Sequence, residues 1–354
     1  MHYRRHHGKR DRIPLHHEYD LGYELMTALA LSARDGQPIA PVSQALEASD
    51  GVHATHAATV RPSESHLDAV EPLMRQAEQV AGGTPCVHIL DRESDAVDYL
   101  RRWDQKSRRF LVRAHRGRIV EHAGEERPLA AVAATLAAQG AFRDVRGVLY
   151  HGRPARQWVA ETAVVLKRPG YRQRPKHDPG GRKRFKGRPL ALRLVVSRVV
   201  APDGTLLAEW LLLTNVSSEV ADETIALWYY WRWRVESFFK LLKSAGLNLE
   251  EWQQETAEAI ARRLLVASMA CAAVWTIARD PSPAAETLRT LLVRLSGRQM
   301  KRGVSFTYPA LLAGLWTLLA ILDVLESYDL ATLYRLADLA RPGFWASPRD
   351  RPNV

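Results

Sequence analysis

The stretch Tyr229-Tyr-Trp-Arg-Trp-Arg-Val-Glu-Ser-Phe-Phe-Lys-Leu-Leu-Lys243 decides how this chain is interpreted. Counted from Tyr229, the residues Arg232, Glu236, Lys240 and Lys243 follow after 3, 7, 11 and 14 positions. These intervals are close to whole turns of an α-helix, so the sequence predicts one helix that carries all five side chains on the same side. A carboxylate among cations and aromatic rings is suited to holding a metal ion beside phosphate groups.

An ordinary solvent-facing helix offers a simpler explanation of the same residues. Arg232 and Glu236 are four positions apart, as are Glu236 and Lys240, and such pairs stabilise an exposed helix by a few tenths of a kcal/mol. The full order Tyr-x2-Arg-x3-Glu-x6-Lys is more specific than a set of ion pairs, and it favours a functional interpretation.

This order of residues resembles the YREK signature of the bacterial cut-and-paste transposases of the insertion-sequence-four family. Three more stretches agree with that family in sequence order: Leu90-Asp-Arg-Glu-Ser-Asp95, Phe110-Leu-Val-Arg-Ala114 and Trp210-Leu-Leu-Leu-Thr214. The resemblance spans residues 9–280. It implies an enzyme that cuts and joins DNA ends, in which Glu236 is the last carboxylate of a DDE triad. The implied fold is α/β: an RNase H-like mixed sheet with flanking helices, interrupted by a β-rich insertion and followed by a helical C-terminal region.

A second candidate carboxylate, Asp91, follows a short apolar segment. Residues 86–90 are typical of a buried strand, 92–104 of a helix and 109–115 of a second strand, which together predict a βαβ unit. The carboxyl ends of strands in α/β sheets open onto a crevice, where functional groups gather. Asp91 also suits the simpler role of a helix N-cap. Asp95 is a weaker candidate, for a cap or a supporting role.

A catalytic divalent ion needs hard oxygen ligands from separate elements, which Asp91 and Glu236 can supply together. The predicted ion is Mg²⁺ or Mn²⁺, and the resemblance implies two ions in an intact triad. By motif match, the residues that would bind phosphates near the cut site are Arg113, Tyr229, Arg232, Lys240 and Lys243. Trp210 would stack near a flipped base, although a core aromatic residue in a buried strand explains it equally well.

The chain divides into a series of predicted segments. They are a basic N-terminal arm at 1–20, the first part of the catalytic core at 21–115, a β-rich insertion at 116–214, the second part of the core at 215–280, a helical region at 281–340 and a disordered tail at 341–354. Within the insertion, residues 167–188 contain ten Lys or Arg, one acidic residue and several Pro and Gly, which predicts a loop. Such a loop either is solvated or binds DNA phosphates.

The composition favours a polyanionic partner. Fifty Lys and Arg against 39 Asp and Glu give a formal net charge of +11, which fits double-stranded DNA in a bacterial cytoplasm. Anionic membrane is the competing partner, but the longest charge-free apolar runs, at 264–278 and 310–322, are shorter than the roughly 20 residues of a membrane span. We expect both runs to be buried helices, and we expect Cys86 and Cys271 to be buried thiols.

The start of the chain departs from the family pattern. The family's core begins with a central strand that carries the first catalytic Asp, but residues 1–18 are too polar and basic for the middle of a sheet. The apolar segment 22–46, with Asp35-Gly36 as a hairpin turn, resembles the second and third strands. We therefore expect the first Asp to be missing, with Asp11 and Asp20 as weak substitutes. Cleavage would then be impaired, and the alternative is an inactive DNA-binding remnant or a regulator of transposition. A homodimer is expected because two DNA ends must be held.

Overall fold

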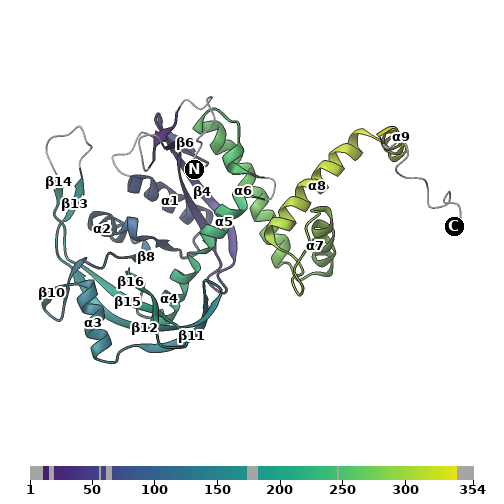
Figure 1. The fold of residues 1–354 in the computed structure, drawn as a ribbon. Coiled ribbons are helices and arrows are strands. Elements are labelled where there is room, and N and C mark those ends of the chain that lie inside the picture. The colour runs from purple at the N-terminus through teal and green to yellow at the C-terminus, as the bar shows by residue number, and fades with distance from the viewer. Residues whose placement is uncertain are drawn as a thin grey trace. The chain divides into compact units, whose positions relative to one another are not determined.

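The computed structural model describes residues 11–15, 20–55, 57–60, 66–173, 182–244 and 247–340. The chain forms two compact units (Figure 1). The first comprises residues 1–239 and 252–266, and the second comprises 240–251 and 267–354. All strands of the described residues belong to the first unit, whereas the described part of the second is helical.

An eight-stranded mixed sheet forms the centre of the first unit. Its strand order is β10 (Glu125–Pro128), β9 (Ile119–His122), β12 (Arg153–Leu166), β15 (Leu190–Val200), β16 (Leu206–Thr214), β8 (Arg109–Arg113) and β7 (Val87–Leu90), and β11 (Arg143–Tyr150) also pairs with β12. Only β7 and β8 are parallel among these described strands, as the predicted βαβ unit requires. Six strands of the 116–214 segment, β9 to β12, β15 and β16, therefore share one sheet with the strands that lead to Asp91.

Helices cover both faces of this sheet because its strands are apolar on both sides. Phe110 and Val112 point toward one face, where they pack with residues of α2 (Val97–Gln105) and α3 (Leu129–Ala138). Leu111, between them, points to the other face and packs with α4 (Asp222–Trp231). Successive side chains of a strand alternate between faces, so one short strand contributes to both cores. This mixed α/β architecture confirms the predicted fold class.

A second, smaller sheet contains the predicted hairpin. Its antiparallel strands are β3 (Glu24–Leu31), β4 (Pro38–Ala48), β5 (Gly51–Ala54) and β6 (Ala57–Val60), and a two-residue pair joins β1 (Ile13–Pro14) to β2 (Leu21–Gly22). The turn at Asp35-Gly36 lies between β3 and β4, as expected. Helix α1 (Val70–Val80) follows a 3-10 turn (His66–Ala69), and its Leu73 packs on Ala45 and Val52 of this sheet.

The prediction of a loop at 167–188 is wrong within the described residues. Two short strands, β13 (Gly170–Gln173) and β14 (Arg182–Phe185), pair there as an antiparallel ribbon, while 174–181 lie outside the described residues. A two-stranded ribbon pairs through its backbone, so it accepts charged side chains that no buried strand could carry. We refer to residues 167–173 and 182–188 as the basic ribbon.

The predicted C-terminal helices are confirmed. Helices α7 (Pro283–Leu295), α8 (Tyr308–Ser327) and α9 (Leu330–Ala340) belong to the second unit, and α5 (Arg234–Leu242) and α6 (Ala257–Arg279) run from the first unit into the second. Gly314 of α8 packs directly on α7, where an added Cβ would lie 1.9 Å from the carbonyl oxygen of Leu292. The tail predicted at 341–354 and the arm at 1–10 lie outside the described residues.

Helices α6 and α8 differ from the expectation for the two apolar runs. They extend beyond those runs to 23 and 20 residues, and both are long and apolar enough to cross a membrane by length and composition alone, a test that core helices also pass. Helix α6 buries one side, including Leu264 and Cys271. Helix α8 was predicted to be buried, but only its first turns are covered: its buried residues all lie between Ala310 and Gly314, whereas residues 319–327 are all exposed.

The two cysteines are free, as their spacing predicts. Cys271 is buried, and its burial raises the pKa of the thiol to about 12. Cys86 was also predicted to be buried, but it is only half-buried because it lies just before the first residue of β7 rather than within the sheet.

Replacing Phe110 tests the core between the sheet and α2. Phe110 is fully buried and lies edge-on to Trp103, with ring centroids 6.1 Å apart. Phe110→Ala should lower the free energy of unfolding by about 3–5 kcal/mol, measured by urea denaturation. Leu149→Ala on β11, where the side chain is 65% exposed, is the control and should change it by less than about 0.5 kcal/mol. Equal effects of the two substitutions would contradict this description of the core.

Candidate metal and DNA site

Asp91 is the first residue after β7, at the end of the strand, as predicted. The parallel register pairs Leu90 with Val112, so the next residues along the two strands, Asp91 and Arg113, are neighbours. Nη1 of Arg113 lies 3.9 Å from Oδ1 of Asp91. The Asp91 side chain is 42% exposed, which leaves it accessible to a ligand.

Asp91 also caps a helical turn, so the simpler interpretation of this residue is correct as well. Its Oδ1 accepts a hydrogen bond of 2.7 Å from the backbone amide of Arg92, the first residue of a 3-10 turn (Arg92–Ser94). The predicted continuous helix over 92–104 is wrong, because the chain is extended at Ala96 before α2 begins. Asp95 holds this break in place by accepting hydrogen bonds from the amide of His115 (2.7 Å) and from Nε of Arg118 (3.0 Å).

Two residues of the signature helix contact the Asp91 carboxylate. The hydroxyl of Tyr229 donates to Oδ1 over 3.3 Å, and Nη2 of Arg232 lies 3.2 Å from Oδ2. A carboxylate has about four lone-pair positions, and these contacts together with the Arg92 amide leave room for a further ligand. The tertiary structure thus joins a strand end and a helix that lie 138 residues apart in sequence.

The signature residues do not form one uninterrupted helix, which corrects the prediction. Helix α4 ends at Trp231 and α5 begins at Arg234, and the amide of Arg232 donates to the carbonyl of Tyr229, three residues earlier. Such a tightened turn changes the helical register locally, and the Arg232 side chain at the break is the one that reaches Asp91. Lys243 lies one residue beyond the end of α5.

Trp210 lies behind Tyr229 in the core. It is only 6% exposed, and its ring centroid lies 5.7 Å from that of Tyr229. In this position Trp210 packs against the Tyr229 ring, whose hydroxyl contacts Asp91. The interpretation of Trp210 as a core aromatic residue therefore fits the structure. Stacking on a base would require Trp210 to be uncovered first.

The electrostatics of the site keep Tyr229 protonated. Burial of the ring, followed by the negative charge of Asp91, raises the pKa of Tyr229 to about 12. Its hydroxyl therefore remains a hydrogen-bond donor to Asp91 at neutral pH. The guanidinium of Arg232 lies 5.9 Å from the Tyr229 ring centroid and 5.6 Å from that of Trp233, so the cation is also held by aromatic faces.

Glu236 is half-buried in the first turn of α5 and belongs to the first unit, as Asp91 does. Within the part of the chain that the structure describes, its carboxylate makes no hydrogen bond or ion pair. Glu236 lies beyond the break between α4 and α5, two residues into α5. Lys240 and Lys243 belong to the second unit, where Lys240 is exposed and Nζ of Lys243 lies 2.8 Å from Oε1 of Glu250.

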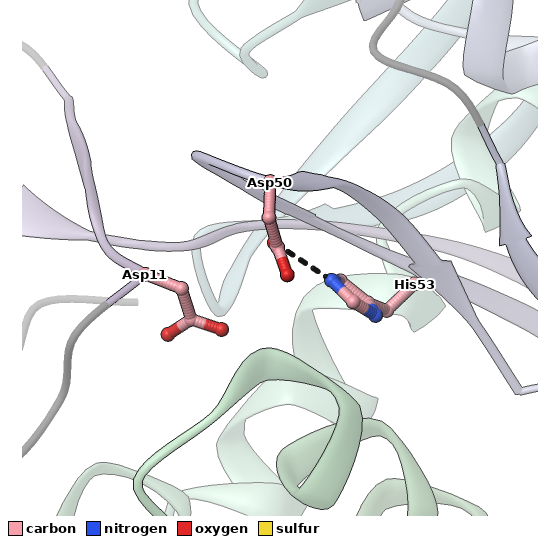
Figure 2. A group of neighbouring side chains, drawn as sticks. All are labelled: Asp11, Asp50 and His53. Carbon is pink, nitrogen blue, oxygen red and sulfur yellow. Dashed lines mark hydrogen bonds and ion pairs between the residues drawn. The ribbon is translucent and has the colours of Figure 1, made fainter.

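A separate group of possible metal ligands lies beside the turn between β4 and β5 of the smaller sheet. Figure 2 shows Asp11, Asp50 and His53, whose nearest ligand atoms all lie within 4.8 Å of one another. Asp11 does not contact Asp91 through any described interaction: its carboxylate accepts from the hydroxyl of Tyr23 (2.5 Å) and from the amide of Ala257 (2.6 Å). Asp50 and His53 are three positions apart, but Asp11 lies 39 positions before Asp50, so no local motif could have indicated the whole group.

Comparison with protein families identifies the chain. The model of the transposase DDE domain matches residues 3–274. The chain belongs to this family. No curated protein matches it. The match covers the mixed sheet, Asp91, the basic ribbon and the signature residues, so this DDE transposase carries its predicted site within the shared domain. The family acts on DNA and generally uses divalent metal ions.

Because the pKa of Tyr229 is raised, the stability of the folded transposase should fall as the pH rises through the alkaline range. An unfolded tyrosine loses its proton near pH 10, whereas Tyr229 does so near pH 12 in the folded chain. The folded state therefore gains stability from Tyr229 below pH 10, and this contribution, of about 3 kcal/mol, is lost as the pH rises from 10 to 12. Urea denaturation across this range should show a steeper fall for the wild type than for Tyr229→Phe. Parallel curves would contradict the assignment.

Proposed function

We propose that this transposase is of the insertion-sequence-four type and uses Asp91 and Glu236 as ligands of Mg²⁺ or Mn²⁺. The observation that carries the proposal is the contact of both Tyr229 and Arg232 with the Asp91 carboxylate. Tyr229 and Arg232 belong to the same signature as Glu236. The first two residues of the signature are therefore in contact with Asp91, the other candidate metal ligand. Oxygen ligands from a strand end and a helix are the kind that a hard divalent cation requires.

The proposed reaction is phosphodiester cleavage at the ends of a transposon, followed by strand transfer. Water attacks the phosphorus and releases a 3′-hydroxyl, and this hydroxyl then attacks a phosphodiester of the target DNA, so that one ester replaces another. A bound divalent ion stabilises the charge that develops on the phosphate oxygens. Arg113 and Arg232 are placed to orient phosphate through their guanidinium groups, and Tyr229 holds Asp91 by a hydrogen bond from its hydroxyl.

The proposed partner is double-stranded DNA, both the inverted repeats at the transposon ends and the target. The net charge of +11 and the basic ribbon support binding through phosphates. Lys240, Lys243 and, once uncovered, Trp210 are proposed to contact DNA near the cut site. We further propose a cytoplasmic homodimer that holds two ends together, since cut-and-paste transfer must coordinate both ends.

Cleavage by this chain is proposed to be weak. The motif match assigns only two of the three carboxylates of a DDE triad, and a two-metal site that lacks one carboxylate should hold its ions poorly. Asp11 is not proposed as the third ligand, because Tyr23 and Ala257 engage its two oxygens. A DNA-binding regulator without cleavage is the alternative that the experiment below separates.

The test measures nicking of a labelled duplex taken from the DNA that flanks the coding sequence, with and without Mg²⁺. Asp91→Asn and Glu236→Gln should each lower the nicking rate by about 100-fold while DNA affinity remains, because each substitution removes a metal ligand and no phosphate contact. Asp50→Asn is the matched control: it neutralises an exposed Asp of the other ligand group and should leave nicking unchanged.

Three results would change this assignment. DNA binding without any Mg²⁺-dependent nicking by the wild type would favour the regulator. Nicking that survives Glu236→Gln but is lost in Asp50→Asn would move the metal site to the group in Figure 2. A wild-type chain that neither binds nor nicks DNA would refute the proposed function.

A further inference from the structure

A buried arginine, Arg101, lies in the middle of α2, the helix that follows Asp91. The residue is only 5% exposed. Its Nη2 donates to three successive carbonyl oxygens, those of Leu166 (3.2 Å), Lys167 (3.3 Å) and Arg168 (3.0 Å). These carbonyls mark the point where β12 ends and the basic ribbon begins. One buried guanidinium thus binds the first backbone groups of the ribbon.

The two strands of the basic ribbon approach α2 through glycines. A Cβ added at Gly170 would lie 3.0 Å from the backbone nitrogen of Asp98, and one added at Gly187 would lie 2.8 Å from Cδ of Arg101. The start of β13 and the segment that follows β14 therefore both pack closely on one helix, at the base of the ribbon. Nη2 of Arg188 lies 3.5 Å from Oδ2 of Asp104, a further contact between the ribbon and the same helix.

The placement of Arg101 is energetically demanding, which argues against an incidental contact. Burial of the guanidinium lowers its pKa, although the nearby Asp98 opposes this effect. Nε and Nη1 have no hydrogen-bond partner within the described residues. An uncompensated buried charge is costly, so the three carbonyl contacts are the main compensation that these residues show. A methionine would fill most of the same space without this cost.

Helix α2 is a rigid support for the ribbon. Its Leu100 and Trp103 are fully buried in the core, and the hydroxyl of Tyr99 donates to Oδ1 of Asp68 over 2.6 Å. The helix begins six residues after Asp91, and Asp95 holds the connection through His115 and Arg118. The base of the ribbon and the candidate metal ligand are therefore attached to one short segment of chain.

We propose that Arg101 is a positioning residue that fixes the basic ribbon to the helix following Asp91, so that DNA phosphates bound by the ribbon have a set position relative to that carboxylate. This rests on the proposed function for the identity of the ligand, DNA. Arg184 and Lys186, both exposed, are the described ribbon cations that would contact phosphates. Arg101 itself touches no DNA.

The experiment combines Arg101→Met with a ribbon in which the two exposed cations, Arg184 and Lys186, are replaced by Arg184→Gln and Lys186→Gln. DNA affinity of the full chain is measured against salt concentration with a duplex from its own flanking DNA and a scrambled duplex. Arg101→Met alone should lower affinity about tenfold for both duplexes and make the salt dependence shallower by one to two phosphate contacts. In the ribbon that lacks Arg184 and Lys186, Arg101→Met should have a smaller effect, because two of the phosphate contacts that Arg101 positions are already lost.

Matched variants separate positioning from loss of charge or of folding. Arg156, on β12, forms an exposed ion pair with Asp144 on β11. Arg156→Met removes the same charge as Arg101→Met and should change DNA affinity little. Gly187→Val leaves Arg101 in place but collides with its guanidinium, and it should reproduce the defect of Arg101→Met. Backbone amide exchange of residues 182–185 should be faster in Arg101→Met and in Gly187→Val, but not in Arg156→Met.

Equal losses of affinity from Arg101→Met with and without Arg184 and Lys186 would overturn the proposal, since Arg101 would then act on the core as a whole. So would amide exchange of the ribbon that is unchanged in Arg101→Met. If the wild type binds no DNA, the proposed function fails, but the exchange measurement still decides whether Arg101 holds the ribbon.

Discussion

The contact of Tyr229 and Arg232 with the Asp91 carboxylate is the constraint on which the rest of the site depends. It joins the end of β7, an edge strand, to α4, the helix that packs on the Leu111 face of the sheet. Trp210 supports the Tyr229 ring from within the core, and Asp95 holds the turn that follows Asp91. Because most of these supporting groups are buried, the carboxylate has a defined orientation in an otherwise exposed position.

The same sheet connects the candidate metal ligand to the surface proposed for DNA. Strands β12 and β15 continue beyond the sheet as the basic ribbon, and Arg101 attaches the start of this ribbon to α2. Residues 116–214 therefore extend the mixed sheet that carries Asp91 rather than forming a separate body, since β16 pairs directly with β8. A phosphate bound by the ribbon and one bound beside Asp91 would be related through rigid, buried elements.

The ionisable groups of the first unit fall into two sets with different chemistry. Asp91 is surrounded by cations, which favours a site that binds phosphate together with a metal ion. Asp11, Asp50 and His53 instead combine two carboxylates with an imidazole, and Asp11 also holds the first amide of α6. The second group thus has a structural role in the described chain whether or not it binds a cation.

The sequence alone determined the α/β class, the βαβ unit around Asp91 and most helices and strands, because periodicity and turn residues are local properties. It could not determine that the signature helix breaks at Arg232, since the break accompanies a contact with a residue 141 positions earlier. The pairing of β13 with β14 and the exposure of α8 were also decided by tertiary structure: backbone pairing can outweigh a loop-like composition, and burial depends on which neighbours cover a helix. Whether an apolar or charged side chain is covered is a property of the packed chain, and no residue carries that information by itself.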